Sequence, residues 1–121
     1  MANPMTAIRW RKEGDITVIR FTANQIADEE YTRRARRELR QLVQAKGGKV
    51  IVSLANVEFM ASIGITLLVE LNRLRHSSAV QLKVCDMQPM VSQVFTSAHI
   101  DRILGIYGTK AEAVAAFDAG Q

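Results

Sequence analysis

The chain has 121 residues, which is the usual size of one domain, and we expect a single folded domain over residues 1–121. Its composition, 48% hydrophobic and 23% charged, is typical of globular proteins and excludes a disordered chain. A formal net charge of +4 is compatible with nucleic acid, an anionic membrane or an acidic protein as partner, and it does not choose among them.

Two absences bear on the cellular location. No apolar run reaches the roughly 18 residues of a membrane span, and the N-terminal residues lack the pattern of a secretory signal. We therefore expect a cytoplasmic protein without membrane insertion. Cys85 is the single cysteine, which excludes a disulfide within the chain and a metal site built from several thiolates. We expect Cys85 to be a small core residue of an apolar strand.

The first predicted elements are two strands and a charged helix. Residues 8–12 and 16–22 flank the turn signal Glu13-Gly14-Asp15, which predicts a β-hairpin. From Asp28 onward, apolar residues recur every three to four positions among charged ones, which predicts an amphipathic helix. We expect Asp28 to cap this helix and Gly47-Gly48 to end it.

The rest of the chain alternates strands with helices. Residues 49–54 form a short apolar run that suits a central strand buried on both faces. Further elements are predicted by apolar runs, a proline and a capping box: strands at 80–85 and 103–107, and helices from Ser62 to about Ser77-Ser78, from Pro89 and from Thr109. The order β β α β α β α β α predicts an α/β fold, with a mixed sheet of about four to five strands and four helices.

Residues that could carry catalysis are few. His76 and His99 are far apart, and neither stands in a metal-ligand spacing with cysteine or a carboxylate, so we expect both on the surface. The chain has no phosphate-binding glycine loop, nucleophile elbow or zinc-protease motif. The sequence therefore predicts a protein that is not an enzyme and that uses no metal or other cofactor.

The first predicted helix contains a block of arginines at positions 33, 34, 36, 37 and 40. One interpretation is a surface that contacts the phosphates of nucleic acid or lipid. The other is a solvated face with internal ion pairs, because Glu29, Glu30 and Glu38 lie in the same helix and no aromatic residues alternate with the arginines. We favour the second interpretation and expect no direct binding of nucleic acid.

The segment VIVSLANVEFMASIGIT at 50–66 runs from a strand through a loop to a helix that begins near Ser62. The N-H groups and dipole of a helix start favour negative charge, so the fold would tolerate a phosphate on Ser62. It would add about two negative charges at pH 7 and could abolish docking of a partner. The alternative is that Ser62 only caps its helix, a common role of serine.

The neighbours of Ser62 also allow two interpretations. Gly64 is small enough to permit close approach of a partner, or it packs against the sheet. Met60, Ile63 and Ile65 form either an apolar docking patch or part of the core. The sequence position alone leaves both alternatives open.

Two segments carry a resemblance to a known family. They are KVIVSLANVEFMASIGITLLVEL at 49–71 and VQLKVCDMQPMVSQVFTSAHIDRILGIYGTKAEAVAAF at 80–117. Through them the chain, from about Ile8 to Phe117, resembles a STAS domain of the anti-sigma factor antagonist type. Members of this family show a hydrophobic strand, a loop with an aromatic residue and Met, an Asp-Ser pair, and Gly at the start of the next helix.

The resemblance implies a partner-switching regulator of transcription. In such a system the unphosphorylated domain binds an anti-sigma factor that is also a serine kinase, and phosphorylation ends the binding. Ser62 matches the phosphoacceptor serine, so this chain would be the substrate of the kinase. The partner-binding residues would be those around it: Met60, Ala61, Ser62, Ile63, Gly64 and Ile65.

The chain departs from the family pattern at three places. Ala61 stands where Asp usually precedes the acceptor, Ile63 stands where a second Ser or Thr is often found, and TANQIADEE at 22–30 replaces a Gly-x-Leu-Asp pattern. STAS-like domains also serve as cytoplasmic components of transporters. A second hypothesis is therefore a STAS subunit of a membrane transport or other signalling assembly that is not phosphorylated. Copurification with an ATPase subunit would favour it.

Overall fold

The computed structural model describes residues 6–46, 48–74 and 80–120. Within these residues the chain forms a five-stranded sheet in the order β1-β2-β4-β6-β7, a two-stranded sheet of β3 and β5, and four α-helices. The strands are β1 (Ile8–Glu13), β2 (Ile16–Phe21), β3 (Gln25–Ile26), β4 (Lys49–Ser53), β5 (Phe59–Met60), β6 (Gln81–Cys85) and β7 (Gly105–Tyr107). The helices are α1 (Glu29–Lys46), α2 (Ser62–Arg73), α4 (Pro89–Ser97) and α5 (Lys110–Asp118), with a 3-10 turn η1 (Ile100–Arg102).

The large sheet combines one hairpin with parallel crossovers. β1 and β2 pair antiparallel, from Ile8 opposite Phe21 to Glu13 opposite Ile16. Their turn uses Gly14 at a φ of 64°, a conformation that glycine adopts without steric cost. β2, β4, β6 and β7 run parallel, which requires the intervening helices. The predicted α/β class, the hairpin and the central position of β4 are confirmed.

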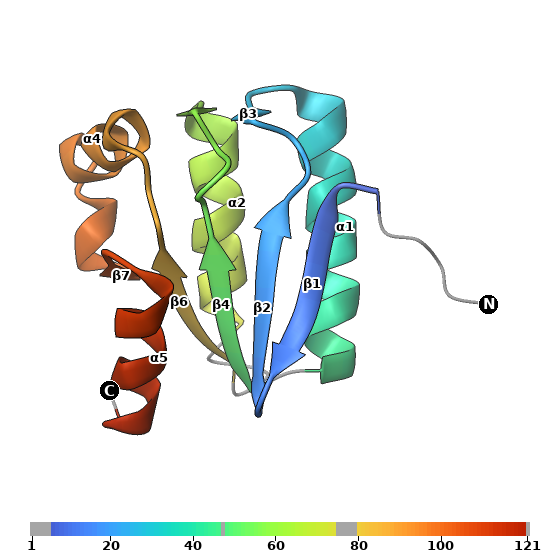
Figure 1. The fold of residues 1–121 in the computed structure, drawn as a ribbon. Coiled ribbons are helices and arrows are strands. Elements are labelled where there is room, and N and C mark those ends of the chain that lie inside the picture. Colours follow the sequence, from blue (N-terminus) through green and yellow to red (C-terminus); the bar gives the residue numbers. More distant parts are fainter. Residues whose placement is uncertain (1–5, 47, 75–79, 121) are drawn as a thin grey trace.

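Helices cover the two faces of the large sheet unequally. α1 and α2 lie on one face, and α5 lies on the other, where it packs on β4, β6 and β7 (Figure 1). Alternation along β4 matches this division, because Val50 and Val52 belong to the larger apolar cluster and Ile51 belongs to the smaller one with Ala113 and Phe117 of α5. The large sheet thus lies between two apolar cores, one on each face.

Some predicted boundaries differ from the structure. β3 and β5 were not predicted, because two-residue strands leave no periodic pattern. The strand predicted at 103–107 contains only Gly105–Tyr107, since the chain before it turns through η1 and buries Leu104. The second helix, predicted to end near Ser77-Ser78, ends at Arg73 with Leu74 as its C-cap. Residues 77 and 78 themselves lie outside the described residues, as does His76. His99 is exposed, with a φ of 60° between α4 and η1.

Glu38 does not act as a counter-charge for the arginine block as we expected. It is 7% exposed, and its carboxyl oxygens accept hydrogen bonds from the backbone N-H groups of Thr6, Ala7 and Ile8 at 3.1, 2.9 and 3.2 Å. It therefore ties the start of β1 to α1. Among the arginines, Arg36 bonds to Glu70 of α2 at 2.8 Å, so part of the predicted ion pairing joins two helices.

Cys85 is a buried thiol that we expect to resist alkylation in the folded protein. Burial, followed by the negative charge of Asp86, raises the pKa of the Cys85 thiol to about 12. The reactive thiolate is therefore scarce at pH 8. Since the pKa is raised from 9.0, the contribution of this thiol to stability is complete below about pH 9 and is lost as the pH rises toward 12.

Treatment with iodoacetamide at pH 8, with and without denaturant, followed by mass spectrometry, measures this protection of Cys85. Modification is expected only in denaturant. Equal rates in the two conditions would contradict a buried thiol.

Candidate partner-binding site

Ser62 is the first residue of α2, and its side chain is exposed. Ala61 occupies the N-cap position with an extended backbone and makes no side-chain cap hydrogen bond. The interpretation of Ser62 as the helix cap is therefore wrong. Alanine is a poor cap, so no side chain satisfies the N-H groups of the first turn. Ser62 lies beside a helix start that is open to a hydrogen-bond acceptor.

The loop before Ser62 is held by the small sheet. β3 and β5 pair in parallel, with Gln25 opposite Phe59 and Ile26 opposite Met60. The Ala61 N-H donates to the Ile26 carbonyl at 2.9 Å, which extends this pairing to the residue before Ser62. The segment that follows β2 therefore fixes where α2 begins. The pairing of β3 with β5 was not predicted, since nothing in the sequence of either segment indicates which segment it pairs with.

Gly64 and Met60 lie in the core beneath the start of α2. A Cβ atom at Gly64 would lie 2.7 Å from Met60 Cγ and 2.8 Å from Ile26 Cγ2, so a larger residue does not fit without a shift. Met60 is 1% exposed. Of the two alternatives stated for each, packing within the domain is the one observed. Neither residue is available to a partner on this surface.

The other predicted contact residues differ in exposure. Ile65 is 8% exposed, while Ala61 and Ile63 are half-buried. Ser62 is thus the exposed member of the predicted set, and only a small part of the Ile65 side chain reaches the surface.

A groove of about 560 Å³ runs between the start of α2 and α4. Its lining is apolar or uncharged: Phe59, Ser62, Ile65, Met90, Gln93, Val94, Ser97 and Ala98. Phe59 is 42% exposed and Met90 is 63% exposed, which is unusual for such large apolar side chains. We call this the α2–α4 groove.

Phe59 and α4 were not predicted to belong to the partner-binding site. The helix from Pro89 was predicted from the proline and the apolar residues after it, which fall into two stripes. Val91 and Phe95 are buried, while Met90 and Val94 form a neighbouring stripe that lines the α2–α4 groove. A second stripe at the same four-residue spacing is the signal that would have indicated an exposed apolar face.

The α2–α4 groove offers contacts rather than chemistry. Its lining contains no titratable side chain. Within the described residues, no group of three or more His, Cys, Asp or Glu side chains is arranged to hold a metal ion. The same residues contain no helix with the length and apolar character needed to cross a bilayer. An open apolar groove with hydroxyl and amide groups suits docking of a protein surface.

Comparisons with known proteins agree with the fold. An anti-sigma-factor antagonist (STAS) domain protein from Planctomyces limnophilus is 29% identical to this chain, with a TM-score of 0.78. The match covers 93% of this chain and 98% of that protein. An anti-sigma factor antagonist from Mycobacterium paratuberculosis is 16% identical, with coverages of 95% and 97% and a TM-score of 0.79. The phosphorylated form of the Bacillus cell fate determinant SpoIIAA is 18% identical, with coverages of 92% and 99% and a TM-score of 0.67.

A search of curated protein sequences found no match. The family model of the STAS domain matches residues 7–113. This match covers most of the chain and agrees with the fold, and the chain belongs to the STAS domain family.

Proposed function

We propose that this domain is an anti-sigma factor antagonist that binds its anti-sigma factor through the α2–α4 groove and is released when Ser62 is phosphorylated. The observation that carries the proposal is the position of Ser62, an exposed hydroxyl in the wall of an apolar groove. The STAS family and its anti-sigma factor antagonist structures support the choice of partner. The partner would also be the serine kinase.

The start of α2 suits a phosphate on Ser62. Because Ala61 provides no side-chain cap, the N-H groups of Ser62 and Ile63 and the helix dipole are available to the phosphate oxygens, while the Gly64 N-H donates to the Ala61 carbonyl. Ala61 also adds no negative charge beside the phosphate. Phosphorylation would therefore leave the domain folded.

The same phosphate would oppose docking. A partner that covers Phe59 and Met90 must remove water from the whole groove. Two negative charges next to this surface would have to be desolvated without a compensating charge in the groove. A small covalent change at one residue would thus switch an entire interface.

Ser62→Asp is expected to weaken binding to the anti-sigma factor at least about tenfold, with a melting temperature within about 2 °C of the wild type. Ser62→Ala should keep the affinity. Thr66→Asp is the matched control, since Thr66 is exposed on the same helix but does not line the groove. Tagged wild type and the three variants would be used for affinity purification from the native cells, and the identified partner would then be measured by calorimetry.

Mass spectrometry of the Ser62 peptide, before and after incubation of the complex with ATP, completes the test. The switch is contradicted if the partner binds wild type and Ser62→Asp equally and the peptide is never phosphorylated. A partner set made of transport subunits in place of an anti-sigma factor would contradict the proposed pathway and favour a transport assembly.

A further inference from the structure

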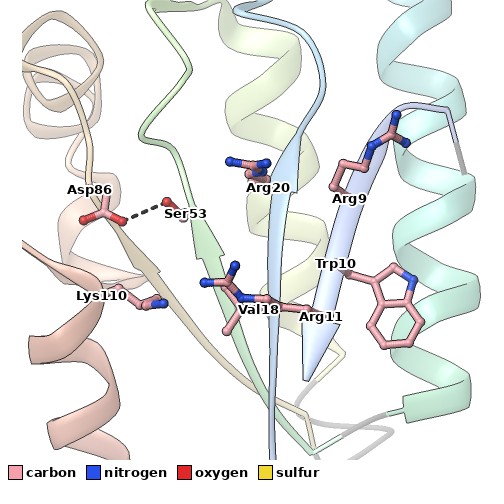
Figure 2. A pocket seen from close by; sticks show the side chains of 8 residues that line it. All are labelled: Arg9, Trp10, Arg11, Val18, Arg20, Ser53, Asp86 and Lys110. Carbon is pink, nitrogen blue, oxygen red and sulfur yellow. Dashed lines mark hydrogen bonds between the residues drawn. The ribbon is translucent and has the colours of Figure 1, made fainter. Parts of the chain in front are cut away.

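A second hollow lies on the face of the large sheet opposite α1 and α2. It has a volume of about 360 Å³, and side chains from three strands, one loop and α5 surround it (Figure 2). The polar groups around it are Arg9, Arg11, Arg20, Ser53, Asp86 and Lys110. We call it the basic pocket. It is separate from the α2–α4 groove, with which it shares no lining residue.

The pairing of β1 with β2 concentrates positive charge in this pocket. Arg9 and Arg20 are direct cross-strand partners, so their side chains leave the same face of the sheet. Like charges in such positions destabilise a sheet. The Arg20 guanidinium makes no hydrogen bond or ion pair with any other residue that the structure describes. A bound anion would supply the missing partner of Arg20.

Two further cations are held in place around the pocket. The Glu13 carboxylate accepts from Arg11 Nε at 2.7 Å and from Lys110 Nζ at 2.8 Å. The hydrogen bond from Lys110, followed by the one from Arg11, lowers the pKa of Glu13, so Glu13 is charged at neutral pH. Figure 2 shows Arg11 and Lys110 extending toward one another over the sheet. The two side chains are ordered by Glu13 before any ligand arrives.

The other end of the basic pocket presents a hydrogen-bond acceptor. Ser53 Oγ donates to Asp86 Oδ2 at 2.8 Å. Asp86 Oδ1 has no hydrogen-bond partner among the described residues. The Asp86 backbone has a φ of 62°, a region that costs energy for a residue other than glycine and that often occurs at functional sites. This end would reject a second anionic group and accept a hydroxyl.

We propose that the basic pocket binds a small organic anion, with a phosphate or carboxylate group on the arginines and a hydroxyl group on Asp86. Guanidinium groups match the planar, two-point geometry of both anions. Val18 adds an apolar contact between the two ends. The volume falls at the lower end of the range of small-molecule sites, so one metabolite-sized ligand fills it.

Binding is tested on the isolated chain by titration of the ¹⁵N-labelled protein, followed by NMR. The probes are ribose 5-phosphate for the phosphate source, gluconate for the carboxylate source, and inorganic phosphate for simple charge neutralisation. We expect saturable changes at amides of β1, β2 and residues near Asp86 for at least one of the two organic anions. Inorganic phosphate should bind at least about tenfold more weakly, because it cannot reach both ends of the pocket.

Arg20→Ala should weaken binding of the organic anion about tenfold or more, since a charge-assisted two-point contact is lost. Arg20→Lys should fall between Arg20→Ala and wild type. Arg37→Ala is the matched control, because it removes the same charge from the exposed face of α1. Without ligand, Arg20→Ala should melt close to the wild-type temperature, because the Arg20 guanidinium makes no hydrogen bond or ion pair with the described residues.

The outcomes separate cleanly. Saturable binding that Arg20→Ala loses and Arg37→Ala keeps supports the site, and the active probe identifies its chemical source. No saturable binding of either organic anion, or an equal loss in both variants, overturns it. Neither result bears on the proposed anti-sigma factor binding, which involves a groove with different lining residues.

Discussion

Glu38→Ala is expected to lower the free energy of unfolding by about 3 kcal/mol and the melting temperature by about 10 °C. The Glu38 carboxyl group bonds to three consecutive backbone N-H groups and to the Thr6 hydroxyl. Alanine would leave the buried N-H groups of Ala7 and Ile8 without acceptors, and each such loss costs about 1–3 kcal/mol. The good helix propensity of alanine offsets only a small part.

Urea unfolding followed by circular dichroism measures this change. Glu30→Ala is the control, because Glu30 is an exposed glutamate of the same helix, and its cost should stay below about 0.5 kcal/mol. Glu38→Gln should fall between the two, since the amide keeps one acceptor oxygen and turns an N-H₂ group toward donors. Equal stability of Glu38→Ala and Glu30→Ala would show that Glu38 does not anchor the start of β1.

Gly64→Val is the second substitution with a large expected effect, about 3 kcal/mol of destabilisation. Its Cβ would meet Met60 and Ile26 at less than 3 Å, and two further methyl groups follow. Gly64→Ala should cost about 1 kcal/mol, because the gain of helix propensity, up to about 1 kcal/mol, offsets part of the clash. Thermal and urea unfolding measure both.

Gly105→Ala is the matched control, since a Cβ there would meet its nearest atom, Tyr107 Cε1, at an ordinary 3.5 Å. A second test combines Gly64→Val with Met60→Ala, which shortens one of the two clashing side chains. The pair should cost less than the sum of the single changes, because the two positions are in contact. Strict additivity would contradict the packing described for Gly64.

The sequence was sufficient to predict the elements that have a local signal, such as a turn or a helix cap. The hairpin has a turn signal with Gly14 at its centre, and α5 has the capping box predicted at Thr109 and Glu112. Both patterns are satisfied within a few residues, so no distant contact can overrule them. The alternation of strands with helices then leaves few ways to arrange the sheet.

The site was predicted only in part, because its geometry depends on distant residues. The helix start at Ser62 follows from the local pattern, but the burial or exposure of the residues around it does not. Met60 is in the core beside its cross-strand partner Ile26, and Phe59 is exposed because successive residues of a strand point to opposite faces. The basic pocket was missed for the same reason. Arg9 and Arg20 look like ordinary surface charges until the register places them opposite each other.

The small sheet of β3 and β5 affects the order in which the domain folds. Its two strands lie on either side of α1 and β4 in the sequence, so their pairing must wait until that unit is organised. Two residues per strand add little stability of their own. We therefore expect the turn that presents Ser62 to be among the last parts to form. An enzyme that requires this turn in its native shape would act only on chains that have finished folding.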